Sequence, residues 1–558
     1  MKKIYYLPLV IFAVSTLTAC KKSSLDRVPQ DQLSSETFWT SENEARLALN
    51  GLYTYLSNGY NYTYDDSASD NAYAQYPWET TAVAVSAGNV DATIDVGYKS
   101  RYTQIRKFNY FLANVDKTPM DETLKKRFIA EAKVIRAFAY FELAKVFGPV
   151  PLLTESYTDP ETTGVAPTPE AEVIAFSLAE LTAAINDLPQ SYAGGKNNET
   201  GRITAGAAWA IKSRIELHYA KWADAAASAQ KVMGMGYQLF RVPAATADDM
   251  KDDYSAFVTF ADEAEKEKFY KGLASYEQQF WKVNENNKEP ILVSQNIDNS
   301  PYDYGNGLGT MFVSSDLGGW SSITPTQELV NAYWDRNGRP FTPPTAAARA
   351  TSYNDGKPTA TYYNEFKNRD TRLYASILFP SNPWNHFNEG YKFTWGRGGN
   401  NNSKTGYNFR KLVDPKFVKE EFDGAQDFAI IRYAEVLLTY AEAQNEAFGP
   451  DGTVYAAIND IRDRAGMPAV DQAVVNTKEA MRELIRNERR IELAAEGQRY
   501  ADIRRWKIGK DVMKSTYDLT NSIVQERIWQ DRFNLMPYPQ SALDHNANLK
   551  AAQATKGY

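Results

Sequence analysis

The chain has 558 residues, and its 62 basic and 69 acidic side chains give a formal net charge of −7. One cysteine and three histidines exclude an internal disulfide and a thiolate zinc site, and they supply no HExxH pair, which argues against metal hydrolysis and Cys/His catalysis. The nearly balanced charge without a basic run argues against nucleic-acid binding, while length alone suggests roughly three or four domains.

The first twenty residues have the pattern of a bacterial lipoprotein signal. Met-Lys-Lys precedes an apolar stretch at residues 4–19, which is shorter than the roughly 20 apolar residues that a membrane-spanning helix needs. The stretch ends in LTAC and resembles the lipobox, in which the cysteine is lipidated and becomes the new N-terminus. We therefore predict a signal peptide over residues 1–19 and a lipid anchor at Cys20. The alternative is an ordinary secretory signal with a chance cysteine.

Apolar residues at helical spacing mark the N-terminal part of the chain. In residues 36–57 they lie three or four positions apart: Ala45, Leu49, Leu52 and Leu56. The same period runs through residues 101–147, and Gly148 with the following proline predicts a sharp end to that helix. The sequence therefore predicts long amphipathic helices in this region.

Two further segments have the pattern of helical hairpins. The first covers residues 203–236 with a break near Lys221, and the second covers residues 427–466 with a break at the sequence GPDG. Both have about 34 residues and small or aromatic packing positions, so they resemble degenerate tetratricopeptide repeats. Such hairpins bury their apolar faces only by stacking, which predicts one solenoid-like body instead of the several domains suggested by length.

The composition changes between roughly residues 240 and 426, where Gly, Pro, Asn, Asp and Tyr predominate. Ile291–Val293 is a short strand-like run bounded by turn-forming residues. Residues 58–100 form a smaller segment of the same kind. We predict loop-rich excursions from the helical scaffold, and such loops often carry binding function.

The densest charge pattern covers residues 482–506, where Glu488, Glu492 and Glu496 would lie one turn apart on a continuous helix. Two such glutamates could act as the acid and base of a glycosidase. Arginines at positions 486, 489, 490 and 499 would instead keep these carboxylates ionised, without the raised pKa that a general acid needs. The pattern therefore favours a structural ion-pair network that ties this helix to its neighbours.

Aromatic and polar residues gather in the loops, where they match the apolar face and hydroxyl rim of a sugar. The alternative is that the rings pin the loops onto the helical body. The candidate positions fall in the sequences DDSASDNAYAQYPW, NSPYDYGNG and SDLGGW: Asp70, Asn71, Tyr73, Tyr76, Trp78, Tyr302, Asp303, Tyr304, Asn306, Asp316 and Trp320.

The motifs taken together, in their order along the chain, resemble those of the SusD/RagB family of Bacteroidetes outer-membrane lipoproteins. The similarity runs from Cys20 to the C-terminus. It is carried by these segments: LDRVPQDQLSSETFWTSENEARLALNGLY, IRAFAYFELAKVFGPVPLL, ITPTQELVNAYW with NGRPF, NRDTRLYASILFP, TGYNFRKL, IIRYAEVLLTYAEAQNEA with INDIRDRAGMP, NERRIELAAEGQRYADIRRW and FNLMPYPQSALDHNANLKAAQATKGY.

The resemblance implies an all-α, SusD-like fold in which tetratricopeptide-like helix pairs carry a large irregular excursion. It implies a single domain over residues 20–558, with helical repeats at about 36–240 and 427–510 and a loop-rich, ligand-facing part at about 240–426. Ligand contacts in the family come from loops that correspond approximately to residues 65–80 and 295–325 here. The implied ligand-binding candidates are Asp70, Asn71, Tyr73, Trp78, Tyr302, Tyr304 and Trp320.

The resemblance also implies a function. Family members capture glycans or other nutrients at the cell surface without catalysis, and they pass them to a SusC-like TonB-dependent transporter. We therefore predict an outward-facing, lipid-anchored glycan-binding protein of the outer membrane with no cofactor, no metal and no enzymatic activity. Two alternatives remain at this point: a lipid-anchored glycoside hydrolase that uses a carboxylate pair, and a transporter lid with little ligand affinity of its own.

Overall fold

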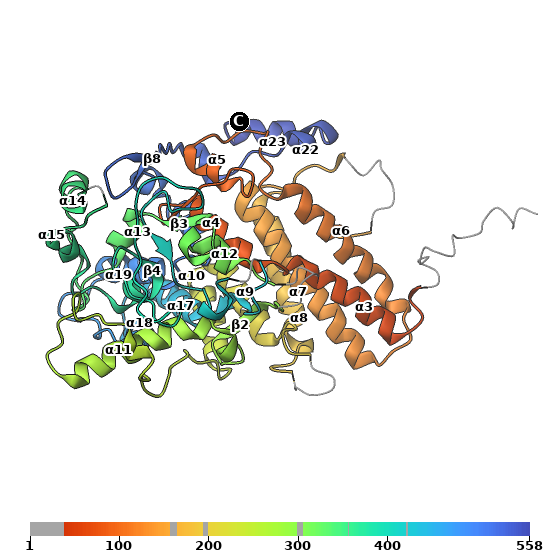
Figure 1. Cartoon of the computed structure of the whole chain (residues 1–558). Helices are drawn as coiled ribbons and strands as arrows, with labels where there is room; N and C mark the ends of the chain where they lie inside the picture. The colour runs from red at the N-terminus through yellow and green to blue at the C-terminus, as the bar shows by residue number, and fades with distance from the viewer. Residues whose placement is uncertain (1–37, 157–163, 193–198, 298–304, 355, 420–421) are drawn as a thin grey trace, which may run out of the picture.

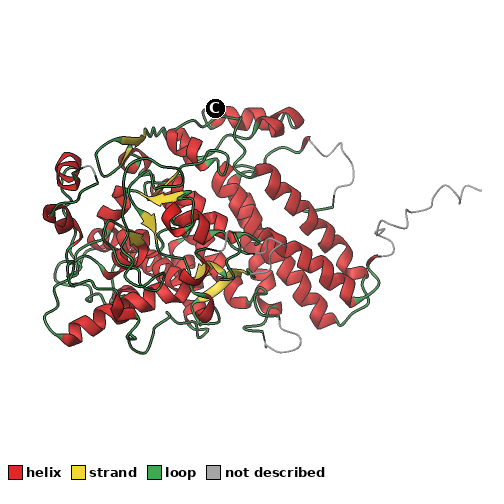
Figure 2. Cartoon of the chain, in the orientation of Figure 1, coloured by secondary structure: helices red, strands yellow, loops and turns green. Residues whose placement is uncertain are grey.

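The structure is a computed structural model that describes residues 38–156, 164–192, 199–297, 305–354, 356–419 and 422–558. Helices dominate these residues, and the strands are short (Figure 2). The all-α prediction is therefore confirmed. Cys20, Tyr302 and Tyr304 lie outside the described residues.

A row of long helices begins near the N-terminus and lies at the right of Figure 1. Its members are α3 (Glu42–Leu52), α6 (Tyr98–Asn114), α7 (Glu122–Phe147) and α8 (Glu170–Ala184). Helix α3 contacts α6 and α7, and α7 packs along α8. Asp121 caps α7 by accepting the N–H of Leu124 at 2.8 Å, and Gly148, at φ +71°, ends it where the sequence predicts.

The row continues through the two predicted hairpins. The first consists of α9 (Ala205–His218) and α10 (Trp222–Met233), and the second of α17 (Tyr433–Phe448) and α18 (Gly452–Arg464). Helix α8 contacts α9, α9 packs on α10, and α10 packs on α17. Buried alanines such as Ala207, Ala225 and Ala229 have no bulk to separate these helices. The first hairpin prediction is confirmed, and the second is confirmed from Tyr433 onward.

Two local predictions are wrong. The segment expected to open the second hairpin as a helix begins as strand β6 (Phe428–Arg432), which pairs antiparallel with β2 (Pro290–Ser294). An apolar run such as FAIIR suits a buried strand as well as a helix, and the presence of β2 decides between them.

The charged segment after residue 482 is not one helix. Helix α19 (Lys478–Glu492) stops, and α20 (Arg499–Trp506) starts after a turn in which Ala495 and Gly497 have φ values of +65° and +75°. A Cβ on Gly497 would collide with the carbonyl oxygen of Tyr62, so another part of the chain approaches this turn closely. Glu496 therefore lies in the turn and not on the face shared by Glu488 and Glu492.

The loop-rich part lies at the left of Figure 1. It includes one long helix, α11 (Glu263–Glu277), which the sequence analysis did not predict. Its other helices are short: α12 (Leu308–Phe312), α13 (Gln327–Ala332), α14 (Ala346–Tyr353), α15 (Ala360–Tyr363) and α16 (Thr371–Ser376). Strand β2 confirms the predicted run at Ile291–Val293. Strands β4 (Ile377–Leu378) and β5 (Asn408–Phe409) form a second two-stranded sheet.

Strands β1 (Ala72–Ala74) and β3 (Ile323–Pro325) join two distant loops in an antiparallel pair, with Tyr73 opposite Thr324. Helices α4 (Thr63–Ser67) and α5 (Ala82–Ala87) flank β1 along the chain. The C-terminal elements are α21 (Gly509–Val512), β7 (Thr516–Tyr517), β8 (Ile523–Gln525), α22 (Gln540–His545) and α23 (Leu549–Thr555). Within the described residues, every helix is too short or too polar to cross a membrane.

Candidate functional site

The β1–β3 pair brings the loop that follows β1 against the loop that precedes β3. Beyond the pair, the backbone N–H of Gln75 donates to the carbonyl oxygen of Ser322 at 3.0 Å. The side-chain amide of Gln75 donates to the carbonyl oxygen of Trp320 at 2.6 Å. The predicted residues Trp78 and Trp320, which are far apart in sequence, therefore belong to one joined pair of loops.

The tryptophan rings of these loops pack against neighbouring rings and remain partly exposed to solvent. Trp78 has 78% of its surface exposed, and its ring centroid lies 4.9 Å from that of Tyr76, with planes tilted by 30°. Trp320 is half-buried and meets Phe422 edge to face at 4.9 Å. We call Tyr76, Trp78, Trp320 and Phe422 the aromatic surface. An exposed tryptophan that is supported by a neighbouring ring offers a flat apolar face to a ligand.

Polar groups border the aromatic surface. The Tyr76 hydroxyl donates to Oδ1 of Asn401 at 2.6 Å, and the carbonyl oxygen of Asn401 accepts from the backbone N–H of Ser315 at 3.0 Å. The exposed carboxylate of Asp316 accepts from the Tyr391 hydroxyl at 3.1 Å. The site predicted from sequence did not include Asn401, Phe422 or Tyr391. They come from separate loops whose composition carries no signal of spatial proximity.

Asp70 and Asn71, two of the predicted ligand-binding residues, are buried and bonded to arginines. Asp70 accepts from Arg499 at 2.7 and 2.9 Å and pairs with Arg490 at 2.8 Å. Oδ1 of Asn71 accepts from Arg490 at 2.8 Å. Burial opposes ionisation of Asp70, but Arg490, Arg499 and Arg527 outweigh it and lower the pKa of Asp70 to about 2. These contacts attach the start of β1 to α19 and α20.

The remaining predicted residues are placed differently. Tyr73 is half-buried on β1, one strand residue away from the loop that carries Trp78. Tyr302 and Tyr304 lie outside the described residues, so their part in ligand binding stays a prediction. The structure therefore joins the loops that carry Trp78 and Trp320 and buries Asp70 and Asn71 at the start of β1.

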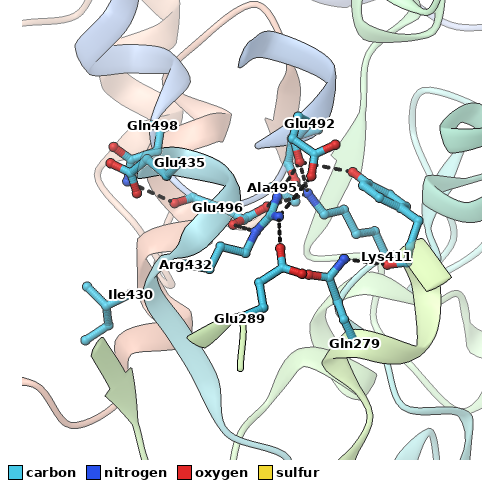
Figure 3. Close-up of polar contacts among 12 residues, drawn as sticks. Gln279, Glu289, Lys411, Ile430, Arg432, Glu435, Glu492, Ala495, Glu496 and Gln498 are labelled. Carbon is cyan, nitrogen blue, oxygen red and sulfur yellow. Dashed lines mark hydrogen bonds and ion pairs between the residues drawn. The ribbon is translucent and has the colours of Figure 1, made fainter. Parts of the chain in front are cut away.

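Glu488, Glu492 and Glu496 belong to a buried ion-pair network, as the sequence favoured. Figure 3 shows the part of the network around Glu492 and Glu496. Glu492 is fully buried and contacts Arg432 at 2.9 Å, Arg372 at 3.1 Å and also Arg464. Glu496 contacts Arg432 at 2.7 Å and Lys411 at 2.6 Å. The partners differ from those expected, since these cations come from distant segments and not from the same helix.

The network favours the ionised form of Glu492 and Glu496. Burial opposes ionisation of Glu492, but Arg464, Arg432, Arg372 and Lys411 outweigh it and lower the pKa of Glu492 to about 2. The pKa of Glu496 is also lowered, because Arg432 and Lys411 outweigh its burial. A glycosidase acid needs the opposite shift, so this pair favours a structural role.

The histidines occupy three unrelated places. His218 is packed against Phe141 and Tyr219, His386 lies 3.0 Å from Asp249, and His545 is at the end of α22. In the part of the chain that the structure describes, no group of three or more His, Cys, Asp and Glu side chains has the arrangement of a metal site.

Two family models match the chain. A model described as the SusD family matches residues 288–558, and one described as starch-binding and associating with the outer membrane matches residues 25–217. The two matches together take in α3 to α8, nearly all of α9, most of the loop-rich part and the second hairpin, and they leave residues 218–287 unmatched. They also span the aromatic surface, since Trp78 falls in the second match and Trp320 in the first.

Whole-chain comparisons agree with these matches. SusD-like protein P25 of Formosa agariphila is 23% identical, with 100% of each chain aligned. The crystal structure of a SusD-like protein from Bacteroides fragilis has a TM-score of 0.77 at 28% identity, covering 94% of this chain and 99% of that one. A SusD-like carbohydrate binding protein from the same species has a TM-score of 0.75 at 27% identity, covering 92% and 100%.

Proposed function

We propose that this chain, which belongs to the SusD family, binds a glycan at the cell surface and delivers oligosaccharide to a SusC-like TonB-dependent transporter. The observation that carries the proposal is the aromatic surface, on which Trp78 is 78% exposed and supported by Tyr76. The likeness to a SusD-like carbohydrate binding protein from Bacteroides fragilis supports the ligand class.

The aromatic surface suits a sugar for a physical reason. A pyranose ring has an apolar C–H face that stacks on an indole, and its hydroxyls need polar partners at the rim. Asn401 and Asp316 supply such partners beside Trp78 and Trp320. Most buried rings of the protein pack against one another, so an exposed indole on a supported loop is the exception that a ligand would explain.

For the site residues, the proposal places Trp78 and Trp320 in direct contact with the glycan and keeps Tyr73, Tyr302 and Tyr304 as further candidates. Asp70 and Asn71 would act on the ligand indirectly, because their oxygens already bind Arg499 and Arg490. They would hold β1, and with it the Trp78 loop, in position.

The anchoring and organisation follow the same proposal. Family membership supports association with the outer membrane. We further propose that residues 1–19 are removed as a signal peptide, that Cys20 carries the lipid, and that residues 20–558 form one domain facing outward. The transporter partner would then lie in the same membrane.

The binding test uses the chain without residues 1–20 and a glycan array followed by calorimetry with the best oligosaccharide. Trp78→Ala and Trp320→Ala should each weaken binding by about tenfold, which corresponds to about 1.4 kcal/mol. Phe448→Ala is the matched control, because Phe448 is 69% exposed at the end of α17, away from the aromatic surface. Unchanged affinity in both tryptophan variants would refute the site.

Two measurements separate this function from its alternatives. An assay for new reducing ends should remain at background, whereas sustained turnover would favour a glycoside hydrolase. Co-purification with a SusC-like transporter, together with no binding across glycan, peptide and glycoprotein panels, would favour a lid with little ligand affinity of its own.

A further inference from the structure

A cavity of about 590 Å³ lies between helices α4, α5, α6, α7 and the start of α20. Its wall includes Glu79, Thr80 and Thr81, the residues that directly follow Trp78. Glu79 accepts from the hydroxyl of Tyr64, another wall residue, at 2.8 Å and from Oγ of Ser322 at 3.2 Å. The cavity wall is therefore bonded to both loops that carry the aromatic surface.

Most charged groups of the cavity wall already have partners. Glu142 pairs with Lys145 at 2.7 Å and with Arg101 at 3.8 Å. Asp95 accepts the backbone N–H groups of Gly97 and Tyr98 at 2.9 and 2.5 Å, at the start of α6. These groups are neutralised or capped without any ligand.

Three polar side chains of the wall have an atom without a hydrogen-bond or ion-pair partner among the described residues. The hydroxyl of Tyr500 and Nε of Arg504 are buried, with only 8% and 6% of these residues exposed, and neither atom has a hydrogen-bond partner among the described residues. The guanidinium of Arg504 stacks over the Tyr500 ring at 4.7 Å, and its Nη1 donates over a long distance of 3.5 Å to the carbonyl oxygen of Asn534. Asp65 is exposed to the cavity, and no cation of the described chain lies within ion-pair distance of it.

The charges of these three groups select the ligand. An unpaired guanidinium donates, an unpaired carboxylate accepts, and a phenol does both. An anionic ligand would be repelled by Asp65 and a cationic one by Arg504, whereas sugar hydroxyls both donate and accept. A buried donor without a partner costs about 1–3 kcal/mol, which a fitting ligand removes.

We propose that this cavity is a second binding site, which holds one neutral sugar unit through Asp65, Tyr500 and Arg504. The inference rests on the proposed glycan-binding function. It adds that one sugar unit of a glycan lying on Trp78 would occupy this cavity.

The test measures binding of neutral monosaccharides and of the array-selected oligosaccharide to the chain without residues 1–20. Asp65→Asn and Arg504→Gln should each weaken monosaccharide binding by about tenfold, or about 1.4 kcal/mol, and Tyr500→Phe should weaken it less because it removes one hydroxyl. Asp224→Asn, an exposed acid in the first turn of α10, is the control and should bind as the parent does. Circular dichroism checks that each variant folds. If Asp65→Asn or Arg504→Gln does not fold, Tyr500→Phe still tests the site.

Trp78→Ala separates the two sites. It should weaken oligosaccharide binding more than monosaccharide binding, because the indole contacts the units that lie outside the cavity. If the cavity variants bind both probes like the parent, the cavity inference is overturned while the proposed function stands. If Trp78→Ala and Trp320→Ala both leave oligosaccharide binding unchanged while the cavity variants weaken it, the aromatic surface is wrong and the cavity site stands. Binding of a zwitterionic amino acid or a uronic acid instead of neutral sugars would also overturn the ligand class.

Discussion

The helical row and the loop-rich part differ in the kinds of side chain that they bury. In α7 most fully buried side chains are apolar, such as Phe138, Ala139 and Leu143, and the acids Glu131 and Glu142 are buried among them. In the loop-rich part Arg369, Arg372, Arg410 and Lys411 are equally buried. A helix pairs its own carbonyl oxygens along the backbone, whereas an irregular loop does not, so the loops need buried donors from side chains.

The buried cations show this directly. Arg369 donates to the carbonyl oxygens of Glu365 at 2.7 Å and Val330 at 2.8 Å. Lys411 donates to those of Glu492 and Ala494, both at 2.8 Å. Glu496 pairs with Lys411 at 2.6 Å and neutralises a charge that would otherwise be costly to bury. The comparison teaches that buried cations, several of them paired with acids of α19 and the turn after it, hold the loop-rich part in place, whereas the helical row packs mainly through apolar side chains.

The largest expected effect comes from removing one cation at the centre of the network. Arg432→Met leaves Glu289, Glu492 and Glu496 each without one of their partners, so we expect the free energy of unfolding to fall by about 3–5 kcal/mol. Urea unfolding followed by circular dichroism measures it. Arg339→Met is the matched control, since Arg339 is exposed, and it should change stability by less than about 0.5 kcal/mol. Equal losses in both variants would contradict the comparison.

Acid should destabilise the protein through the same network. The pKa of Glu492 is lowered from its ordinary 4.5 to about 2, so its stabilising contribution is complete above pH 4.5 and is lost as the pH falls through 4.5 towards 2. The full loss from this group is on the order of 3 kcal/mol, of which about 2 kcal/mol is reached by pH 3. Urea unfolding midpoints between pH 6 and pH 3 measure it.

The control for the acid effect lies in the helical row. Phe138→Leu removes no charge, so it should lower stability by a similar amount at every pH, with the acid dependence of the parent retained. Arg432→Met should have a shallower acid dependence, because Glu492 has lost one of the cations that lower its pKa. A Phe138→Leu variant with an altered acid dependence would show that the two regions are not distinct in this respect.

The sequence predicts the helical row well because its signals are local. Apolar spacing and Gly148 define α7, and small residues on both sides of Lys221 define the α9–α10 hairpin. The break between α19 and α20 was not predictable, since LAAEGQ is rich in helix formers and the turn forms where Tyr62 approaches Gly497. Long-range contacts override local propensity there.

The candidate site shows the same limit. The loops that carry Trp78 and Trp320 were expected from composition and family resemblance, but their direct connection comes from the β1–β3 register. Asn401 and Phe422 join them from loops without any period, so no pattern places them there. The cavity beside Glu79 depends on helices from opposite ends of the chain, and its leftover groups appear only once the partners of Glu142 and Asp95 are known.

The smallest expected change in stability concerns the contact between the two regions, where α11 crosses α18. A Cβ on Gly272 of α11 would lie 2.5 Å from the carbonyl group of Ala465, which is backbone and cannot rotate away. Gly272→Ala should therefore lower the free energy of unfolding by about 1–3 kcal/mol. Gly51 of α3 has nothing within 4 Å of its added Cβ, so Gly51→Ala should instead stabilise the protein by about 0.5–1 kcal/mol. Opposite signs in urea unfolding would show that backbone contact joins the loop-rich part to the helical row, whereas a stabilising Gly272→Ala would show that this crossing is loose.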